Sequence, residues 1–228
     1  MVQKKVVGVP KILCPSIANL PIDENYVNHI IEIDKSGIDI FHIDIMDGTF
    51  VPNFGMAIRE IDFIRSRTKK LLDCHMMIMQ PRRYIELLAE HGIDIIYIHP
   101  EAELIPTETI DKIRALGKQP GIAVNPCTTL ESVKEMLAIV DWVLLMGVNP
   151  GFAGRAYLPY VTPKIKAFNN YRIENNLSYK LVLDGGADEK VITELHHDCG
   201  IEGFVLGKQL FFFQNKPYKE CVDYVRSL

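Results

Sequence analysis

The 228-residue sequence predicts an α/β fold, a (β/α)8 TIM barrel formed by one domain over residues 1–228. The first observation is a regular alternation between short, β-rich apolar runs and longer segments of helical pattern. The second is that eight such runs occur, because eight parallel βαβ units in a chain of this length favour a closed barrel. The third is that no G-x-G-x-x-G follows the first run, as would be expected of an open doubly wound sheet.

The elements can be placed in chain order from these patterns. The eight strands are expected at residues 11–16, 40–46, 71–77, 95–99, 120–124, 142–146, 180–184 and 203–207. Four of the helices between them have recognisable ends, marked by a first-turn proline, a Thr-Thr start or a glycine stop: residues 24–36, 81–91, 129–137 and 189–198.

Composition excludes several classes of protein. Hydrophobic residues make up 48% and charged residues 24%, which is typical of a globular chain with enough apolar material for a core. A net charge of −4 without a basic stripe argues against nucleic-acid binding. No apolar run reaches the roughly 18 residues of a membrane span, and M-V-Q-K-K-V-V-G-V-P lacks the apolar segment of a signal peptide. Five scattered cysteines without C-x-x-C favour reduced, mostly buried thiols, so a cytoplasmic location is expected.

The second predicted strand, I-F-H-I-D-I-M, carries polar residues in its apolar run. Because side chains alternate along a strand, His42, Asp44 and Met46 share the face opposite the isoleucines, which in a barrel is the interior. A buried carboxylate without a partner is costly, so Asp44 needs one. The chemistry of such barrels lies at the carboxyl ends of the strands. His75 lies near the end of the third run and Asp184 ends the seventh.

Two histidines and two carboxylates converging in one lumen satisfy each other best around a divalent metal. His42, Asp44, His75 and Asp184 would form an N2O2 site suited to Zn, Mn, Fe or Co. The alternative is that each is an ordinary core polar residue or helix cap, but four at the same end of different strands favour the metal. His99 is expected to support the site, and Asp73 either shares the face of His75 or is an outer partner of a ligand.

Two further features suggest a phosphate-bearing ligand in an apolar pocket. Glycine-bearing loops follow the last three strands, at V-N-P-G-F-A-G-R, L-D-G-G-A and L-G-K, where backbone N–H groups can close on an anion. The alternative is that these are ordinary turn glycines. Met46, Met77 and Met146 each end a strand and are expected to line the lumen beside the metal, although methionines at such places are usually core filler.

A series of short motifs runs along the chain: P-S-I, H-I-D-I-M-D-G-x-F-V-P-N, L-D-C-H-M-M, H-P-E, G-I-A-V-N-P-x-T, L-L-M-x-V-N-P-G-F-A-G, L-D-G-G and the final L-G. Through these motifs the sequence resembles the ribulose-phosphate 3-epimerase family. The motifs occur in the right order over nearly the whole chain. The resemblance implies a ribulose-phosphate-binding barrel and a cytoplasmic isomerase of carbohydrate metabolism, in the pentose phosphate pathway. It implies that the four ligands hold one divalent metal ion, and that Asp44 and Asp184 are also the acid/base pair.

The resemblance also implies a substrate and the residues that bind it. The reaction is epimerisation at C3, most simply of D-ribulose 5-phosphate to D-xylulose 5-phosphate, through an enediolate that the metal stabilises. One aspartate removes the C3 proton and the other delivers one to the opposite face. The expected substrate-binding residues, beside the methionines, are Ser16, Gly151, Phe152, Ala153, Gly154, Gly185, Gly186, Gly207 and Lys208.

The chain departs from the family pattern at several positions. N-F-G after V-P is shorter than the N-x-x-F-G common in the family, Arg155 stands where glutamine is common, and Gly147 where Ser or Thr is usual. Lys208 replaces a small hydroxyl residue, and it either contacts phosphate or points to solvent. Because L-D-C-H, I-H-P-E and F-A-G are also similar to relatives acting on allulose 6-phosphate, D-allulose 6-phosphate is the alternative substrate.

Two rival functions agree less well with the residues of the predicted site. A decarboxylase of the same superfamily would carry D-x-K-x-x-D, whereas this chain has D-I-M-D without the lysine. A non-catalytic sugar-phosphate sensor would not need both aspartates and both histidines. The expected partners are a ketose-phosphate substrate and further copies of the chain in a homo-oligomer, with no nucleic acid and no membrane. The run Leu210–Phe213 is interpreted as core in preference to a subunit contact.

Overall fold

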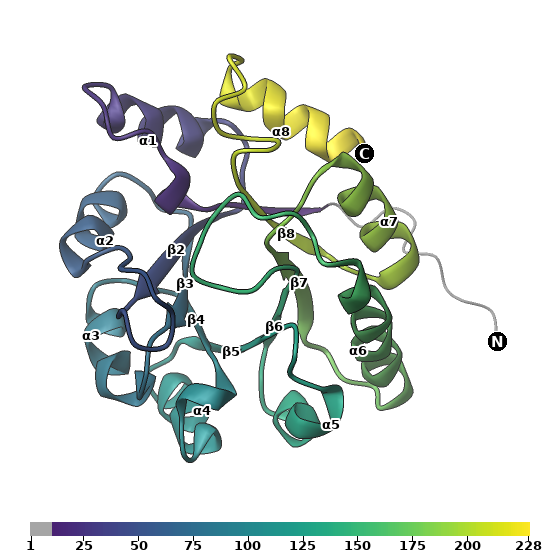
Figure 1. Cartoon of the computed structure of the whole chain (residues 1–228). Coiled ribbons are helices and arrows are strands. Elements are labelled where there is room, and N and C mark those ends of the chain that lie inside the picture. The colour runs from purple at the N-terminus through teal and green to yellow at the C-terminus, as the bar shows by residue number, and fades with distance from the viewer. Residues whose placement is uncertain (1–10) are drawn as a thin grey trace.

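A computed structural model describes residues 11–228, and Figure 1 shows a barrel of strands surrounded by helices. The prediction that no signal peptide occurs concerns Met1–Pro10, which lie outside the described residues. No helix within residues 11–228 is long and apolar enough to cross a membrane.

The eight predicted strands are all present and form one parallel sheet. In chain order they are β1 (Ile12–Pro15), β2 (Ile40–Met46), β3 (Leu71–Met77), β4 (Ile95–Ile98), β5 (Gln119–Val124), β6 (Trp142–Met146), β7 (Lys180–Asp184) and β8 (Gly203–Leu206). Each strand from β2 to β7 pairs with the next along the chain, and β1 pairs with β8. A single parallel bridge between Ser16 and His42 joins β1 to β2 and brings the two edges of the sheet together. The predicted (β/α)8 barrel is therefore confirmed.

A helix follows each strand on the outside of the barrel (Figure 1). The α-helices are α1 (Tyr26–Lys35), α2 (Ile58–Arg65), α3 (Ile85–Glu90), α4 (Pro106–Ala115), α5 (Leu130–Val133), α6 (Thr162–Glu174), α7 (Glu189–Cys199) and α8 (Tyr218–Ser227). Shorter 3-10 helices lie at Ile17–Asn19, Pro81–Tyr84, Pro100–Ala102, Lys134–Ala138 and Pro159–Val161.

Two of the predicted helices are not continuous. The segment expected over residues 81–91 is a 3-10 turn followed by α3, and the break falls at Tyr84, with φ −117° and ψ 1°. The segment expected over residues 129–137 is the short α5 followed by a 3-10 helix, and Val133 at the junction has φ −126° and ψ −3°. Both residues lie outside the α-helical region, so the hydrogen-bond ladder cannot run through them.

The apolar residues form two packed layers, one on each side of the sheet. The outer layer, which includes Phe41 and Ile43, fills the space between strands and helices. The inner layer fills the lumen with side chains such as Tyr97, Leu144 and Val182. Alternation along each strand sends successive side chains to different layers, and it places the polar residues of β2 inside. Of Leu210–Phe213, Phe211 and Phe212 are buried, which agrees with the core interpretation, while Phe213 is exposed.

Candidate metal centre and active site

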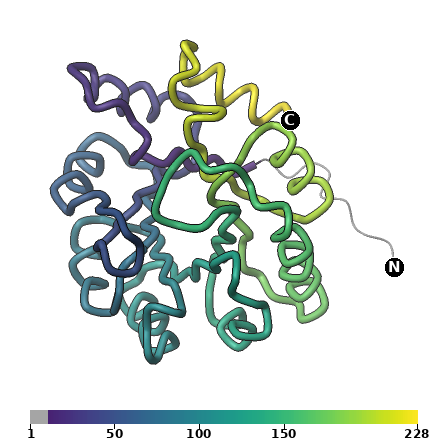
Figure 2. The backbone as a smooth tube through the Cα atoms, viewed as in Figure 1, coloured from purple at the N-terminus to yellow at the C-terminus, as the bar shows by residue number. Residues whose placement is uncertain are grey.

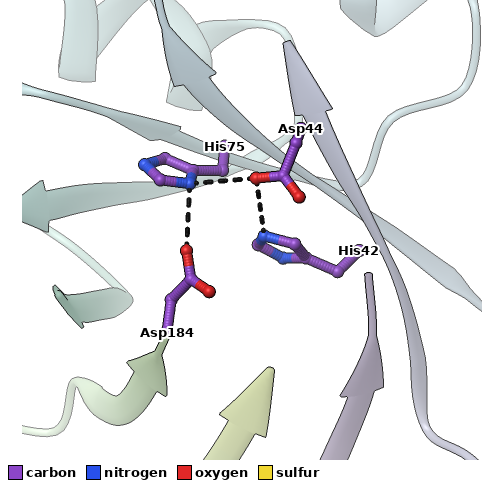
Figure 3. Close-up of side chains that lie close together, drawn as sticks. All are labelled: His42, Asp44, His75 and Asp184. Carbon is purple, nitrogen blue, oxygen red and sulfur yellow. Dashed lines mark hydrogen bonds and ion pairs between the residues drawn. The ribbon is translucent and has the colours of Figure 1, made fainter. Parts of the chain in front are cut away.

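Four polar side chains meet at the carboxyl-terminal end of the barrel. His42 and Asp44 come from β2, His75 from β3 and Asp184 from β7 (Figure 3). The parallel register sets Asp44 directly opposite His75. Each residue offers one donor atom, and all four atoms lie within 4.8 Å of one another. The structure thus brings together the four residues that the sequence suggested as ligands.

The spacing of these atoms fits a shared cation. His42 Nε2 lies 3.4 Å from Asp44 Oδ1, and His75 Nδ1 lies 3.2 Å from Asp44 Oδ1 and 3.3 Å from Asp184 Oδ2. Donor atoms bound to one ion at about 2.1 Å lie roughly 3.0–3.4 Å apart, whereas direct N–H···O hydrogen bonds cluster near about 2.9 Å. The four residues can therefore hold a metal ion, and two imidazoles with two carboxylates suit the first-row divalent metals.

Asp44 is held as a carboxylate by several donors. The Ser16 hydroxyl donates to Asp44 Oδ2 at 2.7 Å, and the Asn19 amide donates to that hydroxyl at 3.1 Å. Burial by itself raises the pKa of Asp44, but the charge and hydrogen bonding of His42, aided by His75, outweigh burial and hold this pKa below its usual range. Asp44 therefore enters the site as an anion, which both a metal ligand and a general base require.

Each of the two histidines has a second buried partner behind it. His42 Nδ1 lies 2.7 Å from Asp73 Oδ1, and His75 Nε2 lies 2.8 Å from His99 Nε2. Burial opposes the charged form of His42, yet the carboxylates of Asp73 and Asp44 raise its pKa well above the usual value. Asp73 thus shares the lumen-facing side of β3 with His75 and contacts the other histidine, while His99 contacts His75.

A cavity of about 350 Å³ opens beside the cluster and is large enough for a small ligand. Asp44 and Asp184 form part of its wall. The cavity is also lined by every residue that was predicted from the sequence to bind substrate: Ser16, Met46, Met77, Met146, Gly151, Phe152, Ala153, Gly154, Gly185, Gly186, Gly207 and Lys208.

The glycines after β7 are required by their surroundings. Gly185 and Gly186 have φ values of 93° and 72°, which non-glycine residues rarely adopt. A Cβ atom would lie 2.3 Å from the Val148 side chain at the first position and 2.5 Å from the Tyr157 backbone at the second. The bare backbone therefore forms this part of the cavity wall, as an anion-binding loop needs. Lys208 is exposed, with its Nζ 5.4 Å from the centre of the Phe213 ring.

The cavity wall also contains residues that were not predicted from the sequence as site residues, among them Asn19, Asn53 and Phe54. Asn53 donates from Nδ2 to the carbonyl of Gly151 at 2.7 Å, although the two residues are 98 positions apart. This bond joins the loop after β2 to the loop after β6, which extends across the mouth of the barrel (Figure 2). No spacing rule reveals such a contact, because it depends on how two loops fold over the lumen.

Comparison with known proteins assigns the family. The model of the Ribulose-phosphate 3 epimerase family matches residues 12–211. The chain belongs to this family. Ribulose-phosphate 3-epimerase from Synechocystis sp. is 36% identical over 226 residues, which cover 98% of this chain and 94% of that protein. The enzyme of the same name from Bacillus subtilis is 38% identical over 201 residues, covering 88% and 91%. Membership of the family makes the chain an isomerase of the epimerase type.

Solved structures support the fold independently. The 3-keto-L-gulonate-6-phosphate decarboxylase of Vibrio cholerae aligns with a TM-score of 0.71, covering 96% of both chains at 12% identity. The phosphoribosyl anthranilate isomerase of Thermus thermophilus aligns with a TM-score of 0.61, covering 94% of this chain and 96% of that one at 13% identity. These similarities concern the barrel alone, because the sequence identity is low and the two proteins differ in activity.

Proposed function

We propose that the protein epimerises a ketose phosphate at C3, with D-ribulose 5-phosphate and D-xylulose 5-phosphate as the interconverted pair. The observation that carries this proposal is the pairing of two carboxylates, Asp44 and Asp184, on different strands of one lumen beside a glycine-lined cavity. The names of the relatives at 36% and 38% identity support the pentulose phosphate as substrate.

Inversion at a carbon atom needs a proton donor and a proton acceptor on opposite faces. Asp44 reaches the cluster from β2 and Asp184 from β7, and in Figure 3 they approach His75 from different directions. One carboxylate takes the proton from C3, which the neighbouring C2 carbonyl makes acidic, and the other returns a proton to the opposite side. The reverse reaction exchanges the two roles.

The remaining residues position the sugar and limit access of water. The Ser16 hydroxyl fixes the rotamer of Asp44 through the bond to Oδ2. Met46, Met77 and Met146 provide an apolar wall for the reacting carbons. Backbone N–H groups around Gly185, Gly186 and Gly207 bind the phosphate and provide anchoring energy remote from C3. A divalent cation held by His42, Asp44, His75 and Asp184 supplies positive charge for the negative charge that develops on the substrate oxygens.

Solvent deuterium exchange at C3 tests the proposal directly. Purified protein with Mn²⁺ or Zn²⁺ is mixed in D₂O with ribulose 5-phosphate, allulose 6-phosphate or unphosphorylated ribulose, and NMR follows the C3 signal. We expect ribulose 5-phosphate to exchange fastest while xylulose 5-phosphate appears. Faster exchange of allulose 6-phosphate would identify a hexulose phosphate as the substrate. Exchange with the phosphorylated sugars but not with unphosphorylated ribulose would support the role of the glycine loops in binding phosphate. No exchange with any ketose phosphate would contradict the proposed reaction.

A further inference from the structure

His99 lies directly behind the candidate metal centre and is fully buried. It follows β4, and its Nε2 lies 2.8 Å from His75 Nε2. The His99 ring contacts two others, with its centre 4.6 Å from that of Phe50 and 5.0 Å from that of His75. Burial and these two ring contacts restrict its position, and its Nε2 edge meets His75.

The short distance between the two rings restricts where their protons lie. At 2.8 Å, two ring nitrogens share one hydrogen bond, so one of them carries the proton and the other offers a lone pair. Two N–H groups cannot face each other at this separation. The contact thus couples the proton position of His75 to that of His99.

The direction of this hydrogen bond follows from the other side of His75. Its Nδ1 is the nitrogen that faces Asp44 and Asp184, and in Figure 3 it points into the cluster while Nε2 points away. A cation in the cluster takes a lone pair from Nδ1, so the remaining proton of the neutral ring lies on Nε2. That proton must then be donated to His99 Nε2, and His99 carries its own proton on Nδ1.

The Nδ1 edge of His99 faces a carboxylate. Glu101 Oε2 lies 3.8 Å from His99 Nδ1, near enough for the charge to favour a proton on that nitrogen. Glu101 is itself held by the Asn125 amide at 3.1 Å and by the Thr128 hydroxyl, both in the loop after β5. This arrangement favours the tautomer of His99 that can accept from His75.

We propose that His99 is a positioning residue for the metal centre. It accepts the Nε2 proton of His75 and directs the Nδ1 lone pair of His75 toward the cation, while its own Nδ1 faces the Glu101 carboxylate without a hydrogen bond. The inference rests on the metal site of the proposed function. It adds His99, hydrogen-bonded to His75, and the charge of the nearby Glu101 carboxylate to the surroundings of the metal site.

Metal affinity tests the role of the acceptor without any substrate. Apoprotein is titrated with Zn²⁺ against a chromophoric chelator for the wild type, His99→Leu and His99→Gln. Leucine cannot accept a hydrogen bond, so the dissociation constant should rise about 10- to 100-fold. The glutamine carbonyl can accept from His75 Nε2, and most of the affinity should return. His196→Leu removes a buried imidazole that contacts the Ile201 carbonyl, far from the cluster, and serves as the control for loss of a core histidine.

The wild-type protein provides a second test that does not depend on a variant folding. Long-range ¹H–¹⁵N NMR of the Zn²⁺-loaded, ¹⁵N-histidine-labelled protein reports which ring nitrogen of each histidine is protonated, and the His99→Gln spectrum identifies the His99 signals. We expect His99 protonated on Nδ1 and His75 on Nε2. A proton on His99 Nε2, or unchanged Zn²⁺ affinity in His99→Leu, would overturn the proposal. Both readouts stand even if no ketose phosphate is turned over, so failure of the proposed reaction is recognised separately.

Discussion

The carboxylates of Asp44 and Asp184 have different surroundings although both reach His75 Nδ1. Asp44 also contacts the Ser16 hydroxyl and His42. Among the described residues, Asp184 forms its ion pair with His75. Changing either to asparagine removes one of the two proton-transfer groups. We expect Asp44→Asn and Asp184→Asn each to lower kcat about 100- to 10,000-fold at saturating metal, while circular dichroism shows that the fold is retained. Activity near that of the wild type in either variant would exclude the two-carboxylate mechanism.

Residues of the site differ in how well the sequence predicts them. His42 and Asp44 are predictable because alternation along a strand fixes the face on which a side chain lies. His75 and Asp184 are predictable because the ends of parallel strands meet at one end of a barrel. Which nitrogen of His75 faces the cluster depends on a side-chain rotamer, and the contact of Asn53 with Gly151 depends on loop conformation. Neither the orientation of the His75 ring nor this loop contact can be predicted from the spacing of residues in the sequence.

At the level of elements, two loops from opposite sides of the barrel are joined over the cavity. The loop after β2 is anchored by Asp47, which accepts from the backbone N–H groups of Thr49, Phe50 and Met79. From this anchored loop Asn53 donates to the Gly151 carbonyl. A side-chain hydrogen bond therefore holds the loop after β6 to the loop after β2, and the loop after β6 extends across the mouth of the barrel (Figure 2).

The joined loops lead to a prediction for Asn53→Ala. Loss of one hydrogen bond of about 1 kcal/mol should raise KM about fivefold, because the cavity wall near residues 151–154 is less often in place. Hydrogen exchange at those backbone amides should become faster, while kcat changes less than KM. Asn170→Ala, on the exposed side of α6, is the matched control. Equal KM values in Asn53→Ala and the control would show that the bond does not position the loop.

Element boundaries show the same division between what sequence patterns determine and what they do not. All eight strands lie within one or two residues of their predicted positions, because each is a short apolar run bounded by polar or turn residues. The continuity of the helices was less predictable. The breaks at Tyr84 and Val133 are departures of backbone dihedral angles within segments whose composition is helical. Tertiary packing decides such details more than local propensity does.

For the whole molecule, stability should depend on pH through His196. Burial lowers the pKa of His196, with smaller contributions from Lys11 and His197, and its Nδ1 lies 2.8 Å from the Ile201 carbonyl. Below about pH 6.5 the unfolded chain binds a proton that the folded state resists, so stability falls as the pH drops. We expect His196→Gln, which can still donate to Ile201, to reduce this loss of stability between about pH 7 and about pH 5. Identical pH profiles of melting temperature would exclude this contribution.

Metal binding should also contribute to the stability of the whole barrel, because its ligands lie on β2, β3 and β7. A cation at 100 times its dissociation constant stabilises the folded state by about 2.7 kcal/mol, so chelation should lower the melting temperature by about 5–10 °C. Protonation of His42 and His75 beside Asp44 offsets part of the loss, since the pKa values of both histidines are raised in the metal-free protein. The double variant Asp44→Asn/Asp184→Asn retains both histidines but loses the anionic ligands, and it should show a much smaller shift. A shift as large as that of the wild type would place the stabilising cation elsewhere in the protein.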